Sequence, residues 1–188
     1  MRFLFSVIMM TISFNLFALP TKVEFAGYKF LTKTKVGGTF TDVKVTHDEK
    51  ATNLESLLKS LKVQIATSSL ETNNRSRNKN ILTTLFATKG SKFVVAKTKT
   101  VNLKDDYIVM SVTIEKITKD IVFQYTKVKD SLIFSSSIDL VAFGLGQQFA
   151  DFAAKCAGYH TDENGIHKTW STIDVIVRSK ITAMNITK

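Results

Sequence analysis

The stretch YIVMSVTIEKITKDIVFQYTKVKDSLIFSSSID, residues 107–139, decides the fold of this chain. Apolar side chains occupy every second position at its start, at Ile108, Met110, Val112 and Ile114. This two-residue repeat is typical of a β-strand with one strongly buried face. The repeat returns in residues 121–125, after a turn near Thr118, and in residues 132–136, after a tight connection at Lys129-Asp130. The stretch therefore predicts three successive strands in an antiparallel meander.

Five further runs of the chain have strand-like patterning, which brings the expected number of strands to eight. These runs are residues 23–30, 38–45, 62–67, 92–101 and 172–181. An open sheet of eight strands would expose two edges that invite aggregation, so closure into a barrel is favoured. The expected fold class is mainly β, an eight-stranded antiparallel barrel, and a barrel of this size can hold one small ligand.

Three connections have apolar residues at helical spacing instead. The first follows Asn53, which is placed to cap a helix carrying Leu54, Leu57, Leu58 and Leu61. The second covers residues 81–86, and the third covers residues 149–156 and is expected to end at Gly158. The barrel is therefore expected to carry two or three short helices in its connections.

The N-terminal residues have the order of a secretory signal peptide. Arg2 precedes a short apolar stretch, residues 3–12, and Ala18 supplies a small residue at the expected cleavage site. The apolar stretch is shorter than the roughly 20 residues that cross a bilayer as a helix. We expect residues 1–18 to be removed by cleavage after Ala18, and residues 19–188 to form one domain in the periplasm. An uncleaved membrane anchor is the alternative.

Composition narrows the classes of partner. The chain has one cysteine, Cys156, so no internal disulfide can form and burial must supply the stability. Its formal net charge of +10 is spread along the chain, which fits a soluble surface or a weak attraction to an anionic membrane surface or cell-wall polymer. No compact basic and aromatic stripe marks the sequence, so nucleic acid is not an expected partner. It also lacks a nucleophile elbow, a phosphate loop and a metalloprotease motif, so we expect neither catalysis nor a cofactor.

Residues 64–81, QIATSSLETNNRSRNKNI, resemble a signature stretch of the YceI-like family. In that family a strand is followed by Thr-Gly-Asn, an Arg-Asp pair and then a Leu. The pattern is matched by Thr72, Asn74, Arg77 and Ile81. Asn73 stands where the family usually has Gly, and Asn78 stands where it has Asp.

Two further stretches continue the resemblance over nearly all of the mature chain. Residues 112–123, VTIEKITKDIVF, are similar to the family's Leu-Thr-Ile strand, Gly-Val-Thr-Lys turn and following apolar strand. Glu115 and Lys116 replace the customary small turn residues there. Residues 138–145 are similar to the family's Asp-Phe-Gly-aliphatic corner, with Ala142 at the acidic position.

The resemblance implies a lipocalin-like barrel in the periplasm whose apolar interior binds a polyisoprenoid or another long-chain lipid, as a carrier, store or sequestering protein. The residues themselves leave a second interpretation open, because side chains can fill a barrel interior completely. The basic surface would then bind an anionic partner. A slip of one residue in strand phase would turn the expected wall outward. The expected wall positions are Phe93, Met110, Val112, Phe123, Tyr125, Phe134, Val175 and Val177.

Residues 146–170 depart from the family, since many relatives have only a short connection there. Together with residues 73–86 they are expected to cover one mouth of the barrel and control ligand entry. The apolar underside of this lid would be formed by Phe86, Phe149 and Phe152. Of these, Phe149 and Phe152 complete the expected ligand contacts. Arg75 or Arg77 is expected near the rim, and of the two only Arg77 falls on the family's Arg position. The favoured role of Arg77 is capping or pairing with a carboxylate.

The same segment carries the cysteine and two of the three histidines, so a metal or redox site is a third interpretation. The candidate ligands are Cys156, His160 and His167 with Asp162 or Glu163, all of them types that zinc or copper accepts. Their spacing is not that of a zinc knuckle or of covalently attached haem, so a buried structural cysteine is favoured over a metal ligand. His47 is expected in a solvated turn.

Overall fold

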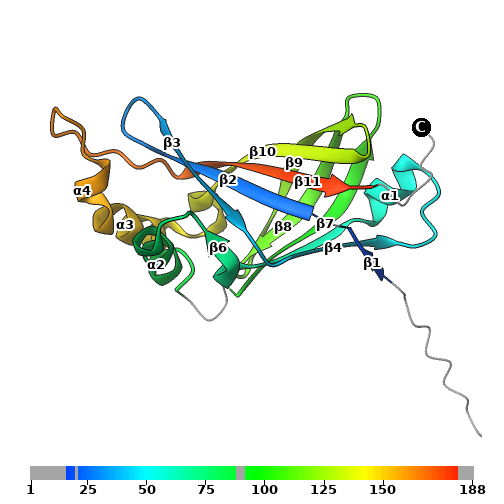
Figure 1. The fold of residues 1–188 in the computed structure, drawn as a ribbon, viewed down its shortest axis with the longest axis horizontal. Coiled ribbons are helices and arrows are strands. Elements are labelled where there is room, and N and C mark those ends of the chain that lie inside the picture. The colour runs from blue at the N-terminus through cyan, green and yellow to red at the C-terminus, as the bar shows by residue number, and fades with distance from the viewer. Residues whose placement is uncertain (1–15, 20, 88–91, 182–188) are drawn as a thin grey trace, which may run out of the picture.

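The computed structural model describes residues 16–19, 21–87 and 92–181, and its main feature is one antiparallel sheet of eleven strands (Figure 1). The strands are β1 (Leu16–Ala18), β2 (Thr21–Lys29), β3 (Thr34–Phe40), β4 (Val43–Asp48), β5 (Lys62–Ala66), β6 (Leu70–Glu71), β7 (Phe93–Asn102), β8 (Tyr107–Ile114), β9 (Ile117–Val128), β10 (Ser131–Asp139) and β11 (Thr172–Lys180). Their order in the sheet is β1-β4-β5-β7-β8-β9-β10-β11-β2-β3-β6.

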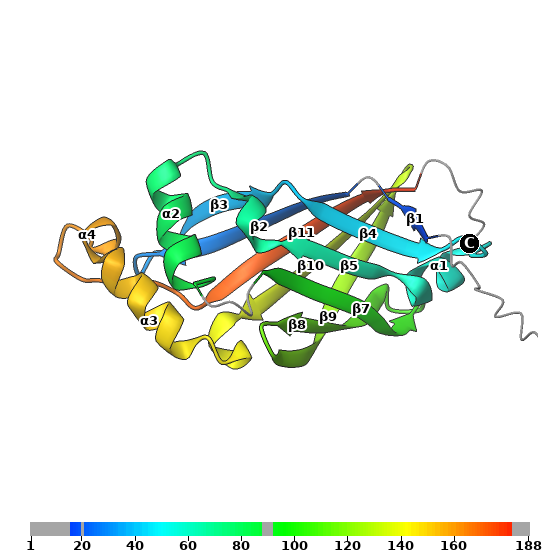
Figure 2. The ribbon, with the colours of Figure 1, turned by 90° about the horizontal axis from the view of Figure 1, so that it is seen from below.

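Short helices lie at the two ends of the curled sheet. They are α1 (Leu54–Ser60), α2 (Arg75–Thr84), α3 (Gly146–Lys155) and α4 (Ala157–His160), with 3-10 helices η1 (Thr67–Ser69) and η2 (Leu140–Phe143). Figures 1 and 2 both place α1 at one end and α2, α3 and α4 at the opposite end. The prediction of a mainly β fold with short helices in its connections is confirmed, and the arrangement is consistent with a lipocalin-like fold.

The predicted strand count of eight is wrong, because extended runs of the chain are interrupted. The run at 38–45 divides into β3 and β4 at Thr41-Asp42, and η1 separates β5 from β6. Across these breaks the Thr41 amide donates to the Ser69 carbonyl at 3.1 Å, and the Ala66 amide donates to the Asp42 carbonyl at 3.0 Å. β3 pairs with β6, and β4 pairs with β5. The two interrupted runs therefore stay hydrogen-bonded to each other on both sides of the breaks.

The predicted meander is confirmed in β8, β9 and β10. Met110 pairs with Ile121, and Tyr125 pairs with Phe134. The first turn lies at Glu115-Lys116 rather than near Thr118, and Glu115 has a positive φ of 55°. The second lies at Lys129-Asp130 as predicted, with a φ of 52° at Lys129. Both turns therefore connect their strands through two residues, a length that suits the twist of a hairpin.

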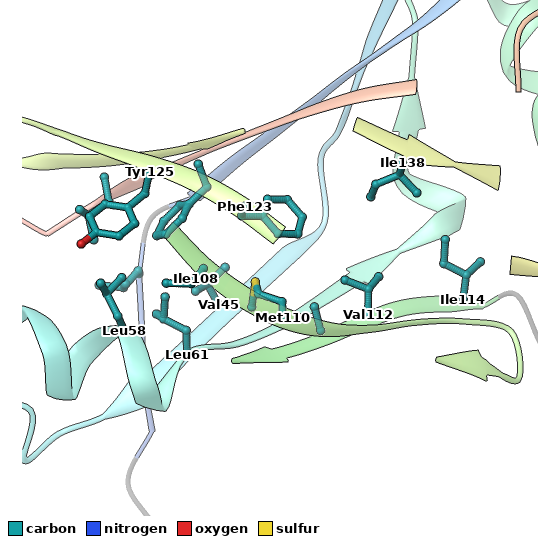
Figure 3. Close-up of a cluster of buried hydrophobic side chains, with 14 of the residues drawn as sticks. Val45, Leu58, Leu61, Ile108, Met110, Val112, Ile114, Phe123, Tyr125 and Ile138 are labelled. Carbon is teal, nitrogen blue, oxygen red and sulfur yellow. The ribbon is translucent and has the colours of Figure 1, made fainter. Parts of the chain in front are cut away.

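The buried face of the meander forms the centre of the core. Ile108, Met110, Val112 and Ile114 are all buried, while the residues between them are at least partly exposed. Figure 3 shows this row along β8, with Phe123 facing it from β9. The inward residues of the sheet thus share one apolar interior.

The predicted helices exist, but two of them have different ends. Asn53 caps α1 as predicted: its Oδ1 accepts from the Ser56 amide at 2.8 Å. Helix α2 begins earlier than predicted, at Arg75, because Asn74 caps it through the Arg77 amide at 2.9 Å. Helix α3 ends at Lys155, and Gly158 lies within α4 instead of ending α3.

The segment between β6 and α2 shows why Asn73 and Asn78 can replace the Gly and Asp that the YceI-like pattern usually has. Asn73 has a positive φ of 58°, a conformation that glycine adopts freely and asparagine tolerates. Asn78 Oδ1 accepts hydrogen bonds from the Thr72 amide at 3.0 Å and the Thr72 hydroxyl at 2.6 Å. Its Nδ2 donates to Glu71 Oε1 at 3.0 Å. An amide at this position therefore joins the end of β6 to α2 without placing a second carboxylate beside Glu71.

Gly38 on β3 makes room for the ring of Phe25 on β2. A Cβ atom at Gly38 would lie 2.8 Å from Phe25 Cε1 and 2.9 Å from the Glu71 carbonyl oxygen, both too close for real atoms. A Cβ at the neighbouring Gly37 would lie 3.6 Å from the Phe25 carbonyl oxygen, which is an ordinary contact. The absence of a side chain at Gly38 thus fixes where the Phe25 ring lies.

We predict that Gly38→Ala destabilises the protein by about 1–3 kcal/mol, because the added methyl group displaces Phe25 and overpacks the interior. Gly37→Ala is the matched control and should change the free energy of unfolding by less than about 0.5 kcal/mol. Guanidinium unfolding of both variants measures the difference. Equal stabilities of the two variants would contradict this explanation of Gly38.

Candidate functional site

Two adjoining cavities occupy the interior of the sheet and the space beneath α2, α3 and α4. The inner chamber has a volume of about 110 Å³ and is lined by inward residues of the strands, among them Ala96, Met110 and Val175. The outer chamber has a volume of about 230 Å³ and is lined by residues of the helices and of the neighbouring strand ends. Both chambers are lined by Phe25, Leu140 and Ile173, so they meet at these three side chains.

Eight of the ten predicted ligand contacts line one of the two chambers. The inner chamber is lined by Met110, Val112, Phe123, Phe134, Val175 and Val177, and the outer chamber by Phe149 and Phe152. Tyr125 is buried as expected but does not line either chamber. Burial, followed by the charge of Asp106, raises the pKa of Tyr125.

The predicted inward position of Phe93 is wrong: its side chain is 45 % exposed on the outer face of β7. A β-bulge between Thr98 and Thr100 reverses the phase of this strand relative to β8. Before the bulge, the even-numbered residues Val94 and Ala96 point inward and line the inner chamber. After the bulge, the odd-numbered Val101 points inward and packs against the core. The sequence alone did not reveal the bulge, since Lys99 resembles any other outward residue of a strand.

The inner chamber offers almost no hydrogen-bonding groups to a ligand. Ser179 is the one residue with a polar side chain among the described residues that line it. The Ser179 hydroxyl lies 2.8 Å from that of Thr21 and forms a hydrogen bond with it. The inner chamber can therefore attract a ligand by excluding water from apolar surface, at about 25 cal/mol for each Å² buried.

The outer chamber combines an apolar floor with cationic and amide groups. Phe149 and Phe152 come from α3, whereas Arg77 and Asn80 come from α2 and Lys29 from the end of β2. None of the described residues that line this chamber is an aspartate or a glutamate. The role favoured for Arg77 from the sequence is not found, because its side chain forms no ion pair among the described residues.

A carboxylate close to the outer chamber is already occupied by hydrogen bonds. Tyr28, which lines the chamber, donates its hydroxyl proton to Asp174 Oδ2, and the Ser137 hydroxyl donates to Asp174 Oδ1 at 2.6 Å. These two bonds, with Ser137 as the larger cause, lower the pKa of Asp174. Asp174 is thus an ionised group that ties β2, β10 and β11 together rather than one that faces the chamber.

Cys156 and His160 line the outer chamber but do not form a metal site. Within the described parts of the chain, no three residues of the histidine, cysteine, aspartate and glutamate types group closely enough to hold a metal ion. The Cys156 thiol is buried, which raises its pKa, and Asn80 Nδ2 lies 3.9 Å from its sulfur. The rings of His160 and His167 stack with centroids 6.3 Å apart.

His47 differs from its predicted place in a solvated turn. It is 4 % exposed and lies in β4, where its Nδ1 is 2.9 Å from the Asp48 carbonyl oxygen. The adjacent charges in His47-Asp48-Glu49 suggested a loop, but strand pairing with β1 extends β4 through Asp48. His47 does not line either chamber.

The described residues contain no helix that is long and apolar enough to cross a membrane. The family model of the YceI-like domain matches residues 15–168. A search of curated proteins finds no match.

Several solved structures share the fold. A polyisoprenoid binding domain from Saccharophagus degradans is 12 % identical with a TM-score of 0.59, over 87 % of this chain and 97 % of that domain. BcnA from Burkholderia cenocepacia is 13 % identical with a TM-score of 0.54, over 85 % of this chain and 94 % of BcnA. The YceI protein of Campylobacter jejuni is 22 % identical with a TM-score of 0.51, over 65 % of this chain and 77 % of that protein. At these identities the likeness establishes the fold.

We predict that His160 makes the stability of the protein fall as the pH is lowered from about 6.5 to about 4. Burial, together with the charges of Lys29, His167 and Arg77, lowers the pKa of His160 from 6.5 to about 4. Between these values the unfolded chain binds the proton more readily than the folded chain, so acid favours unfolding. Denaturant unfolding at several pH values measures this slope.

His160→Gln should reduce the loss of stability over this interval, and His167→Gln should retain most of it. The comparison between variants cancels the titration of carboxylates, which all of them share. An identical dependence on pH in the wild-type protein and His160→Gln would contradict the prediction.

Proposed function

Because the chain belongs to the YceI-like family, we propose that its inner chamber binds the apolar chain of a polyisoprenoid or another long-chain lipid. The protein would serve as a carrier, store or sequestering protein for this lipid. The observation that carries the proposal is the join between the two chambers at Phe25, Leu140 and Ile173. Movement of these three side chains would open a path from the helices at the mouth to the centre of the sheet. The likeness to a domain described as polyisoprenoid binding supports the same class of ligand.

The sizes of the chambers favour a ligand with a long apolar part. Together they reach the lower end of the range of about 300–1,000 Å³ that is common for ligand pockets. Each methylene buried contributes about 0.8 kcal/mol, so a long chain binds tightly without many polar contacts. A chain that passes from one chamber into the other would press against Phe25, whose ring is the widest group at the junction.

The outer chamber suits the polar head of such an amphiphile. Lys29 and Arg77 supply positive charge, while Asn74 and Asn80 supply amide groups. A head that bears oxygen atoms, and an anionic head above all, matches these donors. Helix α3 would then form the lid, with Phe149 and Phe152 covering the first carbons of the chain. This arrangement orients the ligand with its tail towards α1.

The proposal contains no catalytic step. Cys156 is the strongest nucleophile at the chambers, but burial raises its pKa and keeps the thiol protonated at neutral pH. His160 lies near two cations and hydrogen-bonds Thr169 Oγ1 at 2.6 Å. Among the described residues no carboxylate hydrogen-bonds its ring, so none orients it as a general base.

We predict that Ala96→Leu weakens binding of a long-chain probe by about tenfold or more. Ala96 faces the inner chamber, and the longer side chain takes space that the ligand tail would occupy. Val95→Leu is the matched control, because Val95 is the next residue of β7 and lies on the outer face, 45 % exposed. The polyene fatty acid cis-parinaric acid is a suitable probe, since its fluorescence rises in an apolar site.

Circular dichroism and denaturant unfolding would verify that both variants fold. The proposal would be contradicted if a folded Ala96→Leu variant bound the probe as well as Val95→Leu does. It would also be contradicted if the wild-type protein bound no probe.

We further propose that the protein acts after export, with residues 1–18 removed. Cleavage after Ala18 would also remove β1, which pairs with β4 at residues 46–48. We predict a periplasmic protein that begins at Leu19, detected by cell fractionation and N-terminal sequencing. A full-length chain retained in the inner membrane would contradict this expectation.

A further inference from the structure

Exposed apolar side chains gather at the end of the molecule that carries the outer chamber. Leu31 is 55 % exposed in the turn between β2 and β3, Tyr159 is 69 % exposed in α4, and Ile166 is 44 % exposed in the following segment. Figure 1 shows this turn, α4 and the segment that leads to β11 at the same end of the molecule. We call residues 29–33 and 159–170 the mouth surface. Tyr159 and Trp170 also line the outer chamber, which therefore borders this surface.

Backbone and ring contacts hold the two parts of the mouth surface together. The Phe30 amide donates to the Lys168 carbonyl at 2.9 Å, and the Trp170 amide donates to the Tyr28 carbonyl at 3.1 Å. Trp170 Nε1 donates to the Phe30 carbonyl at 2.8 Å. These hydrogen bonds thus hold the backbone that carries the exposed apolar side chains in a defined position.

Positive charge surrounds these apolar groups. Lys33 Nζ and Lys168 Nζ lie 4.5 and 4.6 Å from the centroid of the Trp170 ring, and Lys29 Nζ lies 4.5 Å from that of Phe30. These lysines form no ion pair among the described residues. Lysines beside aromatic and aliphatic groups match the interface of an anionic bilayer, where the ring and the alkyl stems enter and the ammonium groups meet phosphates.

The mouth surface itself contains two carboxylates, Asp162 and Glu163, against the three lysines. Asp162 Oδ1 accepts from the amides of Asn164 and Ile166, both at 2.9 Å. Asp174, close to Lys33 and Lys35, accepts from Ser137 and Tyr28. Glu163 is exposed, and together with Asp162 it opposes binding to an anionic surface.

The opposite end of the sheet provides an internal comparison. It exposes two apolar side chains, Leu103 and Val128, and the sequence places Lys104, Lys127 and Lys129 beside them. Three carboxylates, Asp105, Asp106 and Asp130, lie in the same two turns and balance this charge. That end has similar apolar exposure without an excess of positive charge.

We propose that the mouth surface docks on a lipid bilayer that contains anionic phospholipid, so that the outer chamber faces the membrane. Docking itself needs only the exposed residues and the lysines. The reason for docking at this end, the transfer of a lipid between bilayer and chambers, rests on the proposed function.

Trp170 reports directly on the proposal, because it is the single tryptophan of the chain. Vesicles of phosphatidylcholine, with or without phosphatidylglycerol and with a nitroxide-labelled lipid as quencher, would be added to the purified protein. We expect binding to the anionic vesicles alone, weakened by salt, with quenching of Trp170 emission. No binding to anionic vesicles would overturn the proposal, and so would binding without quenching.

Two pairs of variants locate the docking surface. Lys33→Gln with Lys168→Gln should weaken binding to anionic vesicles about 25-fold, since each surface lysine contributes about fivefold. Leu31→Ser with Ile166→Ser should weaken it by about tenfold, because partly inserted apolar area is lost. The matched controls are Lys104→Gln with Lys129→Gln and Leu103→Ser with Val128→Ser at the opposite end.

Circular dichroism establishes that each variant is folded. Equal losses in the mouth and control variants would overturn the proposal. Vesicle binding by Ala96→Leu separates docking from the proposed function, because that variant has an intact mouth surface and an occluded inner chamber. A failure of lipid binding with normal docking would count against the proposed function alone.

Discussion

The rest of the structure depends on one constraint: the apolar inner chamber is not filled by the protein's own side chains. At about 24 cal/mol for each Å³, an empty inner chamber of about 110 Å³ destabilises the fold by about 2–3 kcal/mol. A small residue, Ala96 on β7, stands where a larger one would fill part of this space. A space of this kind persists in a stable protein most readily when a ligand occupies it.

The helices at the two ends of the sheet differ in how deeply they are buried. Helix α1 closes one end, with Leu57 and Leu58 fully buried and Asn53 as its cap. The other end is covered by α2 and α3, neither of which has a face as deeply buried: α3 has no fully buried residue. Polar and cationic side chains belong to the helical layer at this end. The apolar tail of the proposed lipid would therefore contact apolar side chains inside the sheet, and its polar head would contact these polar and cationic groups.

The sequence predicts the parts of the fold that depend on local periodicity. The meander from Ile108 to Phe134 and the capped helix after Asn53 follow from spacing alone, and seven of the eight wall residues have the expected phase. The errors arise where contacts between distant residues override the pattern. A bulge at Lys99 turns Phe93 outward, and strand pairing draws His47 into β4. The gathering of Arg77, Lys29 and His160 at one chamber joins three distant segments, which no local pattern in one sequence reveals.

The central claim is that the chambers hold one long-chain lipid in the exported protein. Native mass spectrometry of the protein purified from its exporting host without organic solvent tests this directly. We expect a folded species heavier than the polypeptide by the mass of one lipid, and release of that lipid on unfolding. A folded protein that repeatedly shows only the mass of the polypeptide, even after incubation with long-chain lipids, would contradict the claim.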